Sequence, residues 1–184
     1  MPLSGAAGTV LYPASSPYVV AVGGTTLTTD SSYNYIAEVG WDAGGGGISA
    51  WESSPFWQQP VPTTAAGKAI PDVSMDADLV SGAIVYIGCQ PGPSSSACQF
   101  IVGGTSLASP LWLGTWARLQ SAHHNKLGFA SPRLYHLYQA PPATYPGFHD
   151  IVGGCNGLFC AIPGFDYVTG LGTPDVTKLN AALK

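Results

Sequence analysis

Short apolar runs, each closed by glycine or proline, most constrain how this chain can fold. The runs at residues 18–22, 84–88 and 100–102 are continuous and rich in β-branched residues. We therefore predict a strand at each of them. Continuous apolar runs are typical of strands that are covered on both faces of a sheet. The 24 glycines and 16 prolines also predict long loops held by a rigid sheet.

A helix is predicted directly after the third apolar run. Residues 109–123 place apolar side chains along one face, with Pro110 in the first turn, where proline is tolerated. Shorter helices are predicted at residues 132–138 and 174–183. Strands followed by a helix at a strand end favour an α/β architecture built in layers. At 184 residues, one domain covering residues 1–184 is the default.

Charge and hydropathy exclude two classes of partner. Only 9% of the residues are charged, and six Lys and Arg residues leave a net charge of −4. Such a chain has no basic surface to neutralise phosphates, so nucleic acid is a poor candidate partner. No apolar run reaches the length of about 18 residues that a membrane span needs, and the chain does not open like a signal peptide.

The four cysteines form two close pairs in loop-like sequence, Cys89 with Cys98 and Cys155 with Cys160. Neither pair has the spacing of zinc ligands. Two short-loop disulfides in an oxidising compartment are therefore favoured over free buried thiols. This interpretation predicts a secreted, extracellular protein whose signal lies outside these residues.

One serine, Ser106, stands where the third predicted strand gives way to the helix, in "IVGGTSLASP" (101–110). The free amides of a first helical turn, with the positive end of the helix dipole, can stabilise a developing oxyanion. The two preceding glycines would allow a peptide backbone to approach closely. Ser106 is thus a candidate nucleophile, and the alternative is a helix cap.

A serine nucleophile needs a general base, and the histidines supply no familiar one. All four follow Ser106, which excludes the Asp, His, Ser order of subtilisins. No acidic residue lies between Ser106 and His149, which excludes the order of α/β-hydrolases. An unfamiliar order of Ser, His and Asp is the one that remains. We interpret His123 and His124 as a polar helix end and His149 as a loop residue.

The carboxylates offer two groups of candidate bases. Glu38 and Asp42 have the spacing that aligns two side chains on a helix face, but four glycines begin two residues later and argue against a helix. A denser cluster, Asp72, Asp76 and Asp78, is interpreted as caps of turns and strand ends.

Six separated motifs together resemble the sedolisin family of serine-carboxyl peptidases, specifically the C-terminal part of the catalytic domain. They are "YPASSPYVVAVGGTTL" (12–27), "GGGGIS" (44–49), "IPDVSMDAD" (70–78), "GGTSLASPLWLG" (103–114), "FHDIVGGCNG" (148–157) and "PGFDYVTGLGTPDV" (163–176). They cover nearly the whole chain. The resemblance implies a subtilisin-like, mostly parallel sheet covered by helices, of which this chain holds the C-terminal portion.

The resemblance also implies a chemistry for Ser106. In this family the serine of the GTS motif is the nucleophile, a glutamate backed by an aspartate takes its proton, and a further aspartate serves the oxyanion hole. A carboxylate remains a base where histidine would be charged, so these enzymes suit acid conditions. Peptides or proteins are the implied substrates.

Two departures from the family pattern weaken the case for activity of this chain alone. The family's glutamate and aspartate precede the 12–27 segment and have no counterpart here, while Ala6 of "SGAAG" stands where the oxyanion aspartate belongs. We therefore expect carboxylates from outside the chain, and either the missing N-terminal part of the catalytic domain or self-association as a partner. The alternative is an inactive, calcium-stabilised scaffold or a peptide-binding module.

The resemblance further implies a calcium site in the last two motifs. Asp150 and Asp166 would supply side chains, and Ile151, Ile162 and Gly164 would supply carbonyl oxygens, the ligands that Ca²⁺ prefers. From the residues alone, the two aspartates would be loop caps. Ile162 stands where the family often has glycine, so its backbone must adopt the required angles.

Overall fold

The computed structural model describes residues 10–62, 66–87, 99–138 and 146–183. Its strands are β1 (Val22–Thr29), β2 (Tyr35–Gly40), β3 (Gly47–Ser53), β4 (Gly67–Ile70), β5 (Val73–Asp76), β6 (Ala83–Tyr86), β7 (Gln99–Val102), β8 (Phe148–His149) and β9 (Thr173–Pro174). Its helices are α1 (Thr105–Ala122), α2 (Ala130–Leu137) and α3 (Val176–Ala182), with a 3₁₀ turn η1 (Phe56–Gln58).

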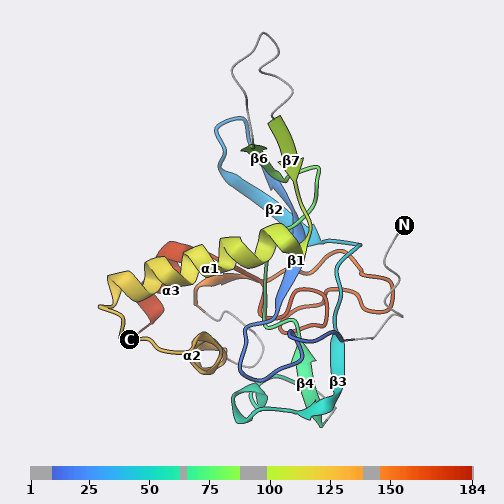
Figure 1. Cartoon of the computed structure of the whole chain (residues 1–184), viewed down its shortest axis with the longest axis vertical. Helices are drawn as coiled ribbons and strands as arrows, with labels where there is room; N and C mark the ends of the chain where they lie inside the picture. Colours follow the sequence, from blue (N-terminus) through green and yellow to red (C-terminus); the bar gives the residue numbers. More distant parts are fainter. Residues whose placement is uncertain (1–9, 63–65, 88–98, 139–145, 184) are drawn as a thin grey trace.

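Helix α1 crosses the middle of the molecule and packs against a three-stranded sheet (Figure 1). The strand order of this sheet is β2-β1-β5, in which β1 and β5 are parallel and β1 and β2 antiparallel. The other pairs among the described strands, β3 with β4, β6 with β7 and β8 with β9, are antiparallel. The parallel pair and the helix that covers it confirm the predicted α/β class.

The core lies beneath α1 and α2. Helix α1 buries four side chains, those of Leu107, Ala108, Trp112 and Leu119. The spacing of these positions places them on one face of the helix. Trp112 and Leu119 join a cluster that includes Val73 of β5, Leu134 and Tyr135 of α2, and Leu179 of α3. The α1 N-terminus is held at the end of β5 by the amide of Gly104, which donates to the carbonyl of Ala77.

Two of the three predicted strands are confirmed, by β6 and β7, and the first is displaced. The prediction at residues 18–22 overlaps β1 only at Val22. The reason is that the chain before β1 does not run in a ladder. Its carbonyl oxygens at Ala14, Ser16 and Val19 instead accept hydrogen bonds from the Lys68 ammonium.

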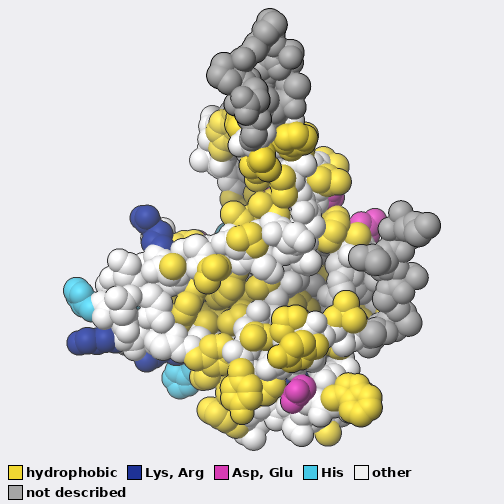
Figure 2. All heavy atoms as spheres, viewed as in Figure 1, with side chains coloured by type: hydrophobic (Ala, Val, Ile, Leu, Met, Phe, Trp, Pro, Cys, Tyr) yellow, Lys and Arg dark blue, Asp and Glu magenta, His cyan; other side chains and the backbone are white. Residues whose placement is uncertain are grey.

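The expectation that all these apolar strands are covered on both faces is wrong for β6 and β7. They form a hairpin that projects from the body (Figure 1), and apolar atoms dominate its surface (Figure 2). Ile84 is 58% exposed, Tyr86 67% and Ile101 59%. An exposed apolar surface of this kind is typical of a region that contacts another polypeptide.

All three helices are close to the predictions, but α1 begins four residues earlier, at Thr105. Pro110 therefore lies inside the helix, not in its first turn, which corrects the prediction. Since proline has no N–H, the carbonyl of Ser106 loses its usual partner four residues on. Helix α3 is capped by Asp175, whose carboxylate accepts the amide of Lys178 at 3.0 Å.

The disulfide between Cys155 and Cys160 is formed, as predicted. The second predicted pair, Cys89 with Cys98, lies outside the described residues, as does Ala6. In the part of the chain that the structure describes, no helix combines the length and apolar character needed to cross a bilayer.

Candidate active site

Ser106 lies in the first turn of α1 with its side chain exposed. The amides of Leu107 and Ala108 both donate to the carbonyl of Gly104, at 2.8 and 3.2 Å. The amides of Thr105 and Ser106 come earlier and have no carbonyl of a preceding turn to bond. The serine hydroxyl is therefore at the positive end of the helix, as the sequence predicts.

The two glycines before the serine serve different needs. A Cβ on Gly103 would lie 2.8 Å from the carbonyl oxygen of Ala77, so this glycine admits the chain's own backbone. Gly104 donates its amide to the same carbonyl and has a φ of 85°, a conformation that glycine adopts without strain. A Cβ there would meet only atoms of Ser106. The room expected for a substrate backbone thus exists beside Gly104 alone.

Among the described residues, none forms a hydrogen bond with the Ser106 hydroxyl. Asp76 and Asp78 of the nearby acidic cluster instead accept hydrogen bonds within turns and at strand ends. Asp78 accepts the hydroxyl of Thr26 at 2.8 Å and the amide of Val80 at 3.0 Å. The hydrogen bond from Val80 holds the pKa of Asp78 below its ordinary value. Asp76 accepts the hydroxyl of Ser81 at 2.6 Å. The interpretation of these two aspartates as caps is confirmed.

Glu38 and Asp42 do not share a helix face, as the glycines after them predict. Glu38 lies in β2 and Asp42 in the turn that follows. The Glu38 carboxylate accepts the hydroxyl of Thr25 at 2.7 Å and also that of Thr173. His149, expected in a loop, instead belongs to the short strand β8.

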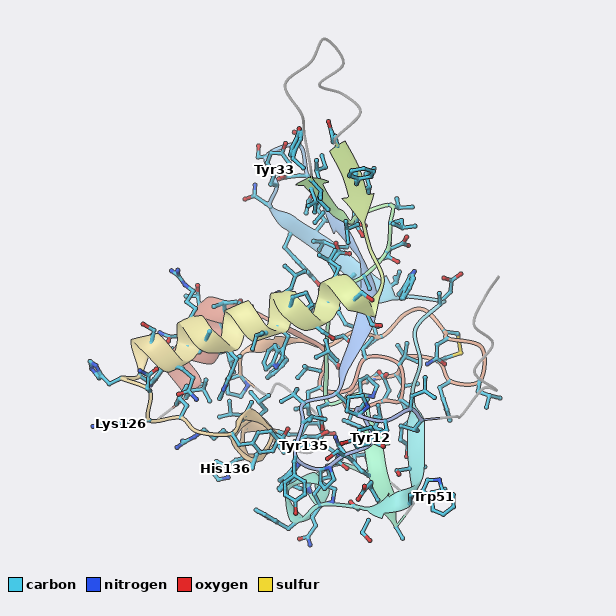
Figure 3. The ribbon with its side chains drawn as sticks, viewed as in Figure 1. Tyr12, Tyr33, Trp51, Lys126, Tyr135 and His136 are labelled. Carbon is cyan, nitrogen blue, oxygen red and sulfur yellow. A yellow bond between two sulfur atoms is a disulfide. The ribbon has the colours of Figure 1, made fainter. Side chains whose placement is uncertain are left out.

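Asp72 does more than cap a strand, which the sequence did not predict. Its carboxylate accepts the amide of Ala21 at 2.8 Å and lies 3.4 Å from the Lys68 ammonium, with both side chains buried. Gln58 and Tyr135 also donate to Asp72, at 3.2 and 2.9 Å. Figure 3 shows Tyr135 extending from α2 into the interior. A lone lysine within an apolar stretch, four residues before an aspartate, was the available signal.

In the loops of the predicted calcium site (residues 150–151 and 162–166), the carboxylates of Asp150 and Asp166 both face residues 162–164. Asp150 accepts the amide of Gly164 at 3.0 and 3.1 Å from its two oxygens, and Asp166 accepts that of Ile162 at 3.3 Å. Asp166 also accepts the amides of Val168 and Thr169, both at 2.7 Å. Burial raises the pKa of Asp150 and of Asp166. The aspartates are therefore loop caps, as the residues alone predict.

The same loops contain the residues of the predicted calcium site. Asp150 and Asp166 accept hydrogen bonds from residues 162–164, and in that prediction the carbonyls of Ile151, Ile162 and Gly164 would be the further oxygen ligands. Gly164 has a φ of 84°, whereas Ile162 is not among the residues of positive φ and its side chain is 55% exposed. The replacement of glycine by Ile162 therefore introduces no backbone strain. No group of three or more His, Cys, Asp or Glu side chains gathers among the described residues.

Known proteins similar to this chain are peptidases. Sedolisin of Pseudomonas sp. (strain 101) is 41% identical over 194 residues, and xanthomonalisin of Xanthomonas sp. (strain T-22) is 39% identical over 193. A solved structure of Pseudomonas sedolisin, a serine-carboxyl proteinase complexed with pseudo-iodotyrostatin, matches 92% of this chain with a TM-score of 0.82. The chain belongs to the sedolisin family. No family model matches it.

The chain corresponds to only part of its sedolisin-family relatives. The match covers 98% of this chain but 31% of sedolisin, and 93% of this chain but 22% of xanthomonalisin. Human tripeptidyl-peptidase 1, 32% identical, is matched over 32% of its length. Of the solved sedolisin chain, 47% is matched. For this chain, the peptidase activity of these longer proteins is therefore a proposal.

Proposed function

We propose that this chain is part of an acid-acting sedolisin-type endopeptidase in which Ser106 is the nucleophile and a carboxylate from outside these residues is the base. One observation carries the proposal. The Ser106 hydroxyl is exposed at the positive end of α1, beside the open space at Gly104, and no described side chain bonds it. This arrangement presents a nucleophile and an oxyanion site without their base.

The chemistry follows from that geometry. A carboxylate takes the Ser106 proton while Oγ attacks the carbonyl carbon of a peptide substrate, and the negative charge develops on the carbonyl oxygen. The first-turn amides and the helix dipole stabilise that charge. The same carboxylic acid then protonates the leaving amine. A carboxylate is still ionised at pH values at which an imidazole is already protonated. A carboxylate base therefore functions in acid.

The exposed apolar surface supports a partner segment. Besides the β6–β7 hairpin, Leu113 on α1 is 69% exposed and Val80 after β5 is 89% exposed. These residues lie on either side of the Ser106 turn in the chain. The backbone of Leu79, next to Val80, lies against Gly103, so a segment that covers Val80 would pass close to the Ser106 turn. The disulfide and the family relationship support secretion.

The alternative is a non-catalytic scaffold or peptide-binding module, and the absence of any described base at Ser106 favours it. Adding the part of the catalytic domain that this chain does not match distinguishes the two functions. The chain is co-expressed with the part of Pseudomonas sedolisin that it does not match, and peptide hydrolysis is followed from acid to neutral pH. We expect hydrolysis in acid from the pair and none from either part alone. A correctly associated pair without hydrolysis would favour the scaffold.

Calcium is proposed as the ligand of the loop formed by Asp150, Ile151, Ile162, Gly164 and Asp166. The two half-buried or buried carboxylates have no Lys or Arg partner among the ion pairs of the described residues. A divalent cation bound there would supply the missing positive charge. It would hold the 162–164 segment against Asp150, a structural role.

Calcium is expected to stabilise the chain at neutral pH more than in acid. Burial raises the pKa of Asp150 and Asp166 above the usual 3.8. The metal-free folded chain therefore binds these protons more tightly than the unfolded chain, and its stability falls as pH rises through the raised values. Calcium binds the ionised carboxylates, so it offsets this loss at higher pH.

The measurement is thermal unfolding with calcium or with a chelator. At a calcium concentration about 100 times the dissociation constant, we expect about 2.7 kcal/mol of added stability. Asp166→Asn should abolish the calcium effect, while Asp42→Asn, at an exposed turn, should keep it. An equal response of both variants to calcium would contradict the site.

A further inference from the structure

A cavity of about 290 Å³ is lined by residues of the three-stranded sheet, α1, β8 and β9, and neither the proposed catalysis nor the proposed calcium loop uses it. Leu27 of β1, Met75 of β5 and Leu111 of α1 supply apolar lining. Glu38 of β2 and Asp76 of β5 also line it. Its volume is at the lower end of the range for small-molecule sites, so it suits a small ligand or a single side chain.

The strand register places the two carboxylates on one face of the sheet. Glu38 is directly opposite Leu27, and Asp76 is level with Thr25 on the other side of β1. Thr25 and Leu27 are two residues apart, so they point to the same face. Neighbouring strands lie about 4.8 Å apart, so the strands that carry the carboxylates are separated by about 10 Å. Leu27 and Thr25 lie between them.

One wall of the cavity is aromatic. The rings of Tyr35 and His149 stack with their centroids 4.0 Å apart and an interplanar angle of 15°. This stack joins β2 to β8, and Thr173 of β9 holds Glu38 from the same side. The stack therefore gives the cavity flat aromatic surface in addition to its two carboxylates.

The negative charge of the cavity is not balanced within the described part of the chain. The ion pairs found there are Lys68 with Asp72 and Lys178 with Asp175, so neither Glu38 nor Asp76 pairs with a Lys or Arg. Figure 2 shows the Lys and Arg side chains on the visible face gathered at the far end of α1. Hydroxyl groups donate to both carboxylates, which keeps them in place and leaves further lone pairs free.

We propose that this cavity binds a primary alkylammonium ion, with the charged end between Glu38 and Asp76 and the apolar chain against Leu27, Met75 and Leu111. An anion would meet two carboxylates, and a neutral apolar ligand would leave them without a counter-charge. Only a cation with an apolar body satisfies both parts of the lining. The proposal does not depend on the peptidase function.

Met75 makes the proposal directly testable. The chain has only two methionines, so a ¹³C-methyl-methionine label gives a signal for Met75 that Met75→Leu assigns. Titration of the full chain with hexylamine at neutral pH should shift this signal with a dissociation constant of about 1 mM. The neutral analogue 1-hexanol should bind at least about tenfold more weakly, because it lacks the charge-assisted hydrogen bonds.

Two variants and a control locate the ammonium. Asp76→Asn and Glu38→Gln should each weaken hexylamine binding about tenfold, while Asp42→Asn, which removes an exposed carboxylate outside the cavity, should not. If Glu38→Gln does not fold, Asp76→Asn carries the test, because its amide oxygen still accepts from Ser81. Nα-acetyl-lysine amide, tested alongside, distinguishes a protein-borne lysine from a free amine. No shift with either amine, or equal binding of hexanol, would overturn the proposal.

Discussion

Lys68→Met is expected to lower the free energy of unfolding by about 3–5 kcal/mol, the cost of breaking a buried ion pair by removing one partner. Lys68 is fully buried, and its ammonium donates to the carbonyls of Ala14, Ser16 and Val19 at 3.0, 2.7 and 3.1 Å. Methionine keeps the length and apolar stem of the side chain. What it removes is the positive charge that these oxygens and Asp72 surround.

The cost arises because every partner of the ammonium is also buried or fixed. The Asp72 carboxylate would remain with hydrogen bonds from Ala21, Gln58 and Tyr135 but without its counter-charge. The three carbonyls would face an apolar thioether and lose their donor. Because these carbonyls belong to the segment that leads into β1, we expect the loss to spread to the middle strand of the three-stranded sheet.

Urea unfolding followed by circular dichroism measures this effect, and Lys178→Met is the matched control. Lys178 pairs with Asp175 at 2.8 Å, but its side chain is 71% exposed, so its removal should cost less than about 1 kcal/mol. A loss at Lys68 as small as that at Lys178 would mean that water reaches the ammonium, and it would contradict the buried network.

The sequence predicts those parts of the fold that depend on local pattern. The apolar face of α1 and the glycines that precede it are sufficient to locate the strand, turn and helix around Ser106. The start of β1 could not be found in this way, since an apolar run does not reveal that Lys68, about fifty residues later, binds the carbonyls before it. Nor does a run such as residues 100–102 reveal which of its faces is covered, because covering depends on partners that are distant in sequence.

The same distinction between local pattern and tertiary contact holds for the candidate site. Ser106 and the aspartates of the proposed calcium loop were predicted because each lies in a short motif that resembles one of the sedolisin family. The cavity was not found, because Glu38, Asp76 and His149 come from three strands that only the tertiary fold brings together. Asp72 was interpreted as a cap together with Asp76 and Asp78, because the local sequence does not show that the Lys68 ammonium lies against its carboxylate. Burial, which the local sequence does not fix, gives this pair its importance.

Ser106→Ala should reduce peptide hydrolysis by about 10⁴-fold or more in the pair formed with the unmatched part of sedolisin, since removal of the nucleophile eliminates the covalent route. The residual rate would come from substrate binding and the first-turn amides of α1, which the substitution leaves in place. The loss should therefore be expressed mainly in kcat. Initial rates in acid, over a range of peptide concentrations, separate kcat from KM.

Ser109→Ala is the matched control, because Ser109 is exposed on the same helix three residues later. It should leave both kinetic constants within about a factor of two, as expected of a surface substitution. Equal unfolding curves for the two variants would show that neither change acts through stability. Hydrolysis that survived Ser106→Ala at the original rate would assign the attack to another group, and the helix N-terminus would then be a structural feature of the fold without a catalytic role.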